Sequence, residues 1–292
     1  MQITANGIQI EYEEYGPKDG PALILIRGQG SQLIHWPKEL VQGFAERGYR
    51  TVIFDNRDVG LTQRFDLPGV SGKPEDILAA IEVGEVPKAA YTLDDMAQDV
   101  VGLMDALGIE RAHVFGISMG GAVAQALAID HTDRLITDTI VMTAARFQED
   151  RSELVKSILA YPSTRAEYIE NYVQEDAMWG SPGYPIPSDD VRAQAALAWD
   201  RGAEHEGRNR QILAVGSAED RREALTQVDL PCLVIHGADD TLVPADAGRE
   251  IAACIPNSEL HVIDGMGHIV TPLLSPVLVE MVDEFIRRRC PK

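Results

Sequence analysis

The chain opens with two short segments in which apolar and polar positions alternate, and then changes to short, continuous apolar runs. Met1–Ala5 and Gln9–Tyr12 show the alternation, and Asn6-Gly7 between them suits the positive φ angles of a tight hairpin turn. The continuous runs are typical of parallel strands that are buried on both faces. They are Ala22–Ile26, Thr51–Phe54, Ala112–Phe115, Thr139–Thr143, Cys232–His236 and Leu260–Ile263.

Segments with a helical repeat of apolar residues lie between these runs. The clearest begins at Thr92, which caps it together with Asp95, and ends at Gly108. Strands that alternate with helices after an antiparallel start predict an α/β fold, with a mostly parallel central sheet and helices on both faces. The other helical segments are Lys38–Arg47, Gly121–Ile129, Ala245–Ile255 and Pro276–Arg287.

Two longer stretches interrupt this alternation. Thr62–Tyr91 contains prolines, glycines and one isolated apolar cluster, Ile77–Ile81, whereas residues 144–218 are mostly helix-like. A structureless loop of this second length is uncommon in a compact domain. We therefore expect an inserted helical cap at 144–218, on a core formed by residues 1–143 and 219–292.

The expected cap is rich in aromatic side chains, which either line a substrate pocket or pack the small core of the cap itself. Packing is the favoured interpretation, because large rings contribute much of the buried area in a small core. These residues are Tyr161, Tyr168, Tyr172, Trp179 and Trp199.

Composition and charge narrow the class of protein. Of 292 residues, 45% are hydrophobic and 25% are charged, which is ordinary for a globular enzyme. The formal net charge of −20 argues against nucleic acid and anionic membranes as partners, and modestly favours neutral or cationic substrates. Solubility alone is the simpler explanation of this charge.

The 3 cysteines, Cys232, Cys254 and Cys290, show neither a disulfide framework nor metal-ligand spacing, which is typical of a reducing compartment. The segment that follows Met1 lacks the basic and apolar regions of a signal peptide. The longest apolar runs are too short to span a membrane. We therefore expect a cytoplasmic protein.

The strongest chemical signal is the pentapeptide Gly116-Ile117-Ser118-Met119-Gly120. It lies between a predicted strand and a predicted helix, and so indicates a strand, a tight turn and a helix. Such an elbow exposes a serine hydroxyl near a base and near backbone amides, as a nucleophilic serine requires. Glycine is needed two residues before and after the serine, because side chains there would collide with the neighbouring strand or helix.

A serine nucleophile also needs a base, and the base needs an acid that orients its ring. Among 7 histidines, His268 follows the last predicted strand, at the sheet edge that Ser118 also occupies. The acid is expected in the loop after Cys232–His236, where Asp239 and Asp240 are adjacent and periodicity does not separate them. The aspartate that does not face the histidine is expected to be a solvated carboxylate or a helix cap.

Attack of the serine on an acyl carbon produces an oxyanion, which requires preorganised donors. The Met119 amide is one candidate, because the start of a helix favours negative charge. The loop after Ala22–Ile26 supplies the other; its glycines let amides turn inward, and the Gln29 amide is the first choice, with Gly28 as its neighbour. This loop lacks the glycine pattern of a phosphate-binding site.

The elbow and the stretches Val234–Pro244 and Gly265–His268 together resemble the α/β-hydrolase superfamily, along essentially the whole chain. The resemblance implies that Ser118, His268 and Asp240 form a catalytic triad, so that Asp240 is the acid.

Two further stretches, Arg27–Trp36 and Asp55–Gly60, are similar to those of the capped bacterial esterases of the aclacinomycin methylesterase type. Superfamily members usually have His-Gly in the oxyanion loop, and this chain has Arg27-Gly28 instead. The hydrogen bonding and polarity of this loop therefore cannot be carried over from the family.

The resemblance implies a carboxylic ester hydrolase that acts through an acyl-enzyme on a small to medium uncharged ester, with water as the second reactant and no cofactor. The same triad also serves amide, lactone, thioester and carbon–carbon bond hydrolysis and cofactor-free perhydrolysis, and the fold also serves non-catalytic ligand receptors. Dehalogenases and epoxide hydrolases are excluded, because they need a carboxylate at the elbow. The sequence leaves a homo-oligomer open.

Two clusters of polar residues are expected to have structural and not catalytic roles. Glu204-His205-Glu206 is expected to be a solvated polar turn and not a metal site, because adjacent residues on a helix point in different directions. Arg57 and Asp58 are expected to brace the elbow or a nearby loop through hydrogen bonds.

Overall fold

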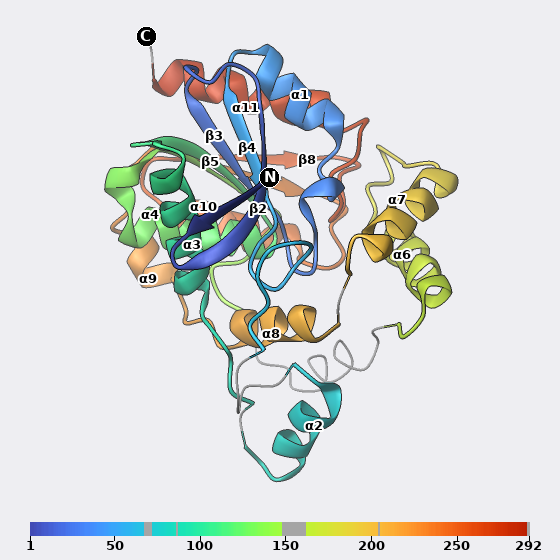
Figure 1. Cartoon of the computed structure of the whole chain (residues 1–292). Helices are drawn as coiled ribbons and strands as arrows, with labels where there is room; N and C mark the ends of the chain where they lie inside the picture. The colour runs from blue at the N-terminus through green and yellow to red at the C-terminus, as the bar shows by residue number, and fades with distance from the viewer. Residues whose placement is uncertain (67–71, 86, 148–161, 204, 291–292) are drawn as a thin grey trace.

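The computed structural model describes residues 1–66, 72–85, 87–147, 162–203 and 205–290. The strands in this part of the chain are β1 (Gln2–Ala5), β2 (Ile8–Tyr15), β3 (Ala22–Ile26), β4 (Arg50–Phe54), β5 (Ala112–Ile117), β6 (Leu135–Val141), β7 (Cys232–Gly237) and β8 (Ser258–Ile263). They form one 8-stranded sheet in the order β1-β2-β4-β3-β5-β6-β7-β8 (Figure 1). The pairings β1–β2 and β2–β4 are antiparallel, and all other neighbours are parallel.

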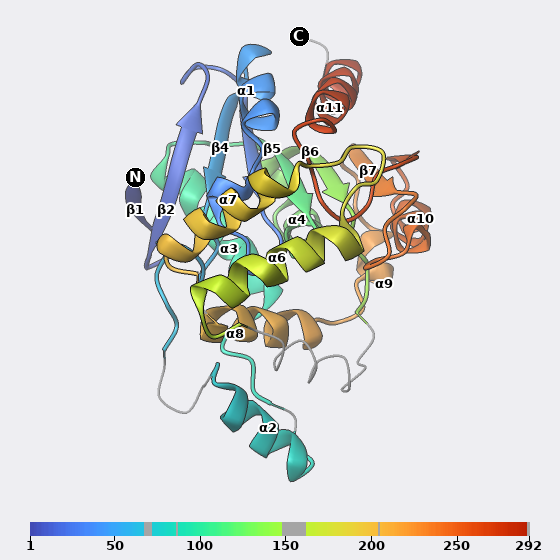
Figure 2. The ribbon, with the colours of Figure 1, turned by 90° about the vertical axis from the view of Figure 1, so that its right-hand side faces the viewer.

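Helices cover both faces of this sheet (Figures 1 and 2). The α-helices are α1 (Lys38–Glu46), α2 (Pro74–Glu82), α3 (Leu93–Ala106), α4 (Met119–Asp130), α6 (Arg165–Trp179), α7 (Ser188–Asp200), α8 (His205–Gly216), α9 (Arg222–Leu225), α10 (Ala245–Cys254) and α11 (Ser275–Arg289); short 3-10 turns are η1 (Leu33–His35) and η2 (Thr132–Arg134). Buried residues of α1 and α11 pack on the face that carries Leu25, and those of α3, α4 and α10 pack on the face that carries Ile24. The predicted α/β architecture is confirmed.

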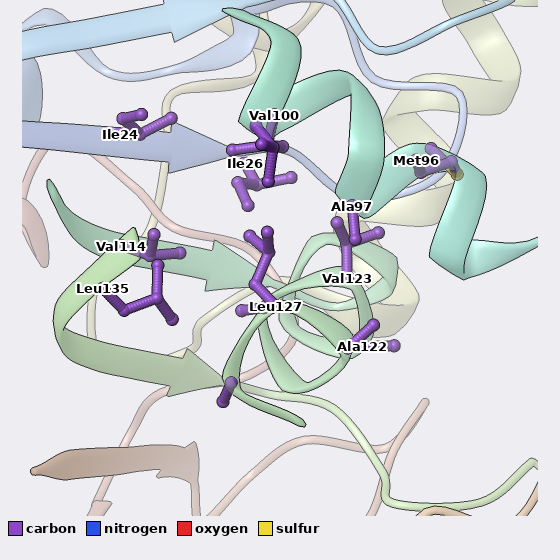
Figure 3. Close-up of a cluster of buried hydrophobic side chains, with 14 of the residues drawn as sticks. Ile24, Ile26, Met96, Ala97, Val100, Val114, Ala122, Val123, Leu127 and Leu135 are labelled. Atoms are coloured by element: carbon purple, nitrogen blue, oxygen red, sulfur yellow. The ribbon is translucent and has the colours of Figure 1, made fainter. Parts of the chain in front are cut away.

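The helix that follows the elbow is fixed by burial on almost every side. Ala97 and Val100 of α3 point toward Val123 and Leu127 of α4, and this layer lies against Ile26 of β3 (Figure 3). Because α4 is buried along most of its length, its apolar composition matches its place between α3 and the sheet. Its first turn is thereby held at the carboxyl edge of the central strands.

β6 lies earlier in the chain than the sequence predicted, since it ends at Val141 and not at Thr143. Two polar residues, Thr137 and Asp138, interrupt the apolar pattern there, yet both side chains are completely buried in the strand. Asp138 pairs with Val114 of β5 and with Cys232 of β7. No described residue forms a hydrogen bond with either of its carboxylate oxygens.

Residues 144–218, here called the inserted segment, contain α6, α7 and α8 in their described part. Helices α6 and α7 lie side by side (Figure 2). Tyr168 contacts Tyr172 and Trp199 between them, and Ile34 from outside the segment joins this cluster. The packing interpretation is therefore confirmed for these rings, whereas Tyr161 lies outside the described residues.

The stretch Thr62–Tyr91 contains helix α2, where the sequence indicated only an apolar cluster. Ile77 of α2 packs against Ile212 and Leu213 of α8. Figures 1 and 2 both show α2 projecting from the rest of the molecule beyond α8. Across the described ranges, every helix is too short or too polar to cross a lipid bilayer.

The isolated Asp138 carboxyl predicts a pH-dependent stability. Burial raises the pKa of Asp138 from 3.8 to about 8, so the folded protein keeps a proton that the unfolded chain releases. The free energy of unfolding therefore falls as the pH rises from about 4 to about 8, by up to about 1.4 kcal/mol per pH unit. Asp138→Asn removes this contribution. Denaturant unfolding should show the variant gaining stability over the wild type across this pH range, and curves that stay parallel would refute the assignment.

Candidate active site

Ser118 lies at a strained turn between β5 and α4. Its φ angle is +53°, in the left-handed region that most residues other than glycine avoid. A Cβ atom at Gly116 would lie 2.2 Å from the carbonyl oxygen of Gly120, and one at Gly120 would lie 2.2 Å from that of Ile26. The two glycines therefore allow the strand, the turn and the neighbouring strand β3 to approach closely enough to hold the serine in this conformation.

The structure brings Ser118, His268 and Asp240 together. His268 Nε2 lies 2.9 Å from Ser118 Oγ, and His268 Nδ1 lies 2.7 Å from Asp240 Oδ2. Both side chains reach Ser118 from loops at the carboxyl ends of β7 and β8, where ligand sites of parallel sheets form. This geometry lets a proton move from the serine to the imidazole while the carboxylate orients the ring.

Asp240 is held as a carboxylate by hydrogen bonds. Its Oδ1 accepts from the backbone N–H groups of Leu242 and Val243, at 3.0 and 2.8 Å. Burial alone would raise the pKa of Asp240, but hydrogen bonds to His236 and His268 and the charge of His268 outweigh burial and leave the pKa below its ordinary value. The group therefore remains negatively charged next to His268.

The neighbouring Asp239 has a different position. Its Oδ2 accepts a hydrogen bond from the Gly265 amide at 2.8 Å, so its carboxylate braces the loop that leads to His268. It is exposed, as expected for the aspartate that does not face the imidazole.

The residues expected to bind an oxyanion lie close to Ser118. A Cβ atom at Gly28 would lie 3.1 Å from Ser118 Cβ, so the loop after β3 passes directly over the serine. Two amides of this loop are engaged elsewhere, because Gly30 donates to Gln211 Oε1 at 2.7 Å and Ser31 donates to the Gly28 carbonyl at 3.3 Å. Neither of these two amides is therefore available to an oxyanion. Met119 is the first residue of α4, where an N–H group has no acceptor within the helix.

Buried ion pairs join the loop after β4 to the inserted segment. Asp58 accepts two hydrogen bonds from Arg210 of α8, at 2.8 and 2.9 Å, and both side chains are fully buried. Arg57 forms a similar pair with Asp99 of α3, at 2.6 and 2.7 Å. The expected bracing role is therefore present, but its targets are α3 and α8 and not the elbow itself. Asp55 adds a third pair, at 2.7 Å from Arg201 Nη1.

The inserted segment also holds the loop that carries His268. The backbone N–H of His268 donates to the Trp179 carbonyl at 2.7 Å, and that of Gly267 donates to Ser181 Oγ at 3.0 Å. A Cβ atom at Gly267 would lie 2.1 Å from the carbonyl oxygen of Gly180. The histidine loop and the end of α6 are therefore packed backbone against backbone.

Sequence reasoning missed the polar residues through which the segment reaches the site. Arg210 and Gln211 lie in the middle of α8, for which no specific prediction was made from the sequence, and both are completely buried. The segment His205–Glu206 begins this helix, and Glu204 lies outside the described residues. A hydrophobic pattern cannot reveal such residues, because their burial is stabilised by partners distant in the sequence. The one signal in the sequence was the run Arg208-Asn209-Arg210-Gln211, in which four consecutive polar residues fall within one turn of a helix.

A mostly parallel sheet covered on both faces, with a half-buried serine at a strained elbow beside a histidine and an aspartate, defines a protein of the hydrolase class. The family model described as alpha/beta hydrolase fold matches residues 21–271, and the chain belongs to this family.

Curated relatives and solved structures agree with this assignment. The chain is 26% identical to rhodomycin D methylesterase from Streptomyces sp. strain C5, over 91% of each chain. It is 26% identical to 3-oxoadipate enol-lactonase 2 from Acinetobacter baylyi, over 90% of this chain and 87% of that enzyme. The crystal structure of the enol-lactonase from Burkholderia xenovorans LB400 has the same fold, with a TM-score of 0.74, 24% identity and coverage of 98% and 99%.

The contact between Ser181 and the histidine loop predicts an effect on the hydrolytic rate. In Ser181→Ala, the Gly267 N–H and the Ile269 carbonyl lose their hydroxyl partner, so the loop loosens. We expect kcat for an activated ester to fall roughly ten- to hundredfold, and the free energy of unfolding to fall by about 1–2 kcal/mol. The matched control is Ser217→Ala, whose exposed hydroxyl bonds only to Ala214 of the same helix among the described residues. Equal rates for the two variants would contradict the positioning role.

Proposed function

We propose that the protein is a serine carboxylic ester hydrolase, with Ser118 as the nucleophile, His268 as the general base and Asp240 as the residue that orients the imidazole. The observation that carries the proposal is the continuous contact from Ser118 Oγ through both nitrogens of His268 to the Asp240 carboxylate. The left-handed backbone of Ser118 supports it further, because strain of this kind persists where a nucleophile must be exposed.

The reaction follows from the direction of these contacts. His268 Nε2 takes the proton of Ser118 Oγ while Oγ bonds to the acyl carbon and the carbonyl π electrons move to oxygen. When the tetrahedral intermediate collapses, the alcohol leaves with the proton from Nε2, and an acyl-enzyme remains. A water molecule then loses a proton to Nε2 and attacks the acyl carbon, so that the acid is released and Ser118 regains its proton. Asp240 stabilises the positive imidazole in both halves.

The oxyanion of each tetrahedral intermediate needs donors that are already in position. We assign this role to the amides of Met119 and Gln29, with Gly28 giving the loop its close approach to Ser118. Preorganised amides are effective because they do not have to reorient when the charge develops.

We infer that the inserted segment acts as a cap and sets the size of the ester, with residues 1–143 and 219–292 as the catalytic core. The contacts of Trp179 and Ser181 with the loop of His268 support this arrangement. The substrate class is a small to medium ester, and the similarity to rhodomycin D methylesterase supports an ester of a small alcohol.

Lactone hydrolysis is a second candidate. A lactone is a cyclic ester and would pass through the same acyl-enzyme, with the leaving alcohol still attached to the acyl group. The similarity to 3-oxoadipate enol-lactonase 2 is the observation that favours it.

The cellular setting is part of the proposal. All 3 cysteines are free thiols, which is typical of a reducing compartment, and we infer a cytoplasmic enzyme. Its reactants are a small-molecule ester and water, and the reaction uses no cofactor. The net charge of −20 disfavours nucleic acid as a partner.

Labelling of Ser118 tests the nucleophile. The wild type should hydrolyse p-nitrophenyl butyrate and gain the mass of one fluorophosphonate adduct on Ser118. Ser118→Ala should lose both, because it keeps the pocket but has no attacking oxygen. Hydrolysis that persists at the wild-type rate in Ser118→Ala would sink the proposal, and a folded wild type that neither reacts nor hydrolyses esters would favour a ligand receptor.

Adjacent aspartates provide a matched pair of variants for the acid. Asp240→Asn should lower kcat roughly 10³- to 10⁴-fold, because an amide in place of the carboxylate stabilises neither the required tautomer nor the positive ring. Asp239→Asn should leave kcat within a few-fold of the wild type, because that carboxylate contacts the Gly265 amide and not the imidazole. The assignment is wrong if the larger loss follows the change at Asp239.

A further inference from the structure

Arg27, at the end of β3, is a positively charged side chain without a negatively charged partner among the described residues. Its Nε and Nη1 atoms are enclosed by protein, and no described residue accepts a hydrogen bond from either. Its Cζ atom lies 4.7 Å from the centroid of the Trp36 indole. Stacking on an aromatic ring stabilises a cation, but it neither neutralises the charge nor satisfies the N–H donors.

A third donor adjoins these two. Trp36 Nε1 is also enclosed, and no acceptor for it occurs in the described part of the chain. Buried donors in proteins are normally satisfied by protein groups, water or a ligand. A guanidinium and an indole N–H that both lack acceptors therefore form a site that is incomplete without an acceptor from outside the described chain.

Three other arginines that are buried or half-buried have aspartate partners. Arg57, Arg201 and Arg210 each lie within 2.9 Å of an aspartate oxygen. Burial lowers the pKa of Arg27 to about 10, and no carboxylate opposes this shift. Arg221 is also buried and has no paired acid among the described residues, but it donates to Gln125 Oε1 and to the Ala144 carbonyl. Among these five arginines, Arg27 alone has neither a paired acid nor a hydrogen-bond acceptor in the described part of the chain.

The neighbouring histidine does not supply an anion either. His35 Nδ1 lies 2.8 Å from the Gln32 amide, so it accepts this hydrogen bond, and Nε2 lies 2.9 Å from the Tyr172 hydroxyl. Burial, and then the charge of Arg27, lower the pKa of His35 to about 3. His35 is therefore neutral and donates through Nε2, and the surroundings of Arg27 are rich in donors.

The position of Arg27 connects this cation to the reaction site. Arg27 directly precedes Gly28, which lies against Ser118, and a Cβ atom at Gly120 of the elbow would lie 2.6 Å from the Arg27 carbonyl oxygen. The backbone is fixed there, because Asn56 Nδ2 donates to the same oxygen at 3.0 Å. Arg27 as a whole keeps partial exposure, so the residue is not sealed from solvent although two of its nitrogen atoms are.

We propose that Arg27 binds a carboxylate on the acyl part of the substrate, so that the enzyme acts on monoesters of dicarboxylic acids. This inference rests on the proposed ester hydrolysis and adds the substrate class. The acyl part is indicated because Gly28 and Gln29, the next residues, are those assigned to the acyl carbonyl oxygen. The net charge favoured neutral or cationic substrates, but such long-range effects are screened beyond about 8 Å at physiological salt. A desolvated cation on the residue next to Gly28 therefore determines the preference at the site.

Two methyl esters of equal length test the proposal. Monomethyl glutarate carries a terminal carboxylate where methyl pentanoate carries a methyl group, and a pH-stat measures kcat/KM for both. The wild type should prefer monomethyl glutarate. In Arg27→Met the ratio of the two kcat/KM values should fall roughly ten- to hundredfold, as expected for loss of a charged hydrogen bond. Arg27→Lys should retain part of the preference.

The control is Arg134→Met, which removes the same charge at the opposite edge of the sheet, next to the first residue of β6. It should keep the wild-type ratio. A wild type that prefers methyl pentanoate, or a ratio that Arg27→Met leaves unchanged, would overturn the inference while ester hydrolysis stands. If neither ester reacts and Ser118 takes no fluorophosphonate, the proposed function itself has failed.

A measurement on the wild type alone covers the case in which the Arg27 variants do not fold. Glutaramate should inhibit the hydrolysis of p-nitrophenyl acetate competitively, and at least tenfold more strongly than pentanamide, which has a methyl group in place of the carboxylate. Equal inhibition by the two amides would overturn the carboxylate site without bearing on Ser118.

Discussion

The arrangement around Ser118 depends on one steric constraint, the close approach of three backbone segments at the elbow. Gly116 faces the carbonyl of Gly120, and Gly120 faces the carbonyl of Ile26, with no room for a side chain at either contact. This packing over-determines the turn and maintains the left-handed conformation of Ser118. The same contacts set the distance between the elbow and the loop after β3, and therefore bring Gly28 against the serine. Burial of α4 beneath α3 keeps the first turn of the helix in register with both.

Several charged side chains around this centre form aspartate–arginine ion pairs. Asp58–Arg210 and Asp55–Arg201 are buried pairs that connect the loop after β4 with α8 and with the residue that follows α7. Removing one partner from such a pair leaves an uncompensated buried charge, which costs about 3–5 kcal/mol. These pairs therefore fix the second half of the inserted segment, while Trp179 and Ser181 fix its middle at the loop of His268. Against this background of matched charges, the unmatched Arg27 stands out as a position where the fold leaves a cation available.

Much of the fold and the candidate site could be predicted from the sequence, because the relevant signals are local. Short apolar runs identified the parallel strands, and the glycines around Ser118 identified the elbow. Prediction failed where burial is polar. Asp138 interrupts the apolar pattern at the start of β6, and the hydrophobic pattern did not indicate that Arg210 and Gln211 of α8 are buried. The hydrophobic pattern also could not distinguish Asp239 from Asp240. Which of the two contacts the imidazole depends on the position of His268, 28 residues further along the chain. Contacts between distant segments decide these positions, and no local pattern records them.

The backbone contact between Gly267 and Gly180 has a consequence for how such enzymes diverge. Since the loop of His268 and the end of α6 pack backbone against backbone, with the Ser181 hydroxyl as a further contact, the two cannot be exchanged independently. Helix α7, between these fixed points, and the part of α6 that precedes Trp179 are free to accept new surface residues, and so to acquire new specificities, without altering Ser118, His268 and Asp240. Transplanting the whole insert from a homologue would instead require its partners in the core, the loop of His268 and the aspartates at 55 and 58, to match it, so that both parts form one inherited module.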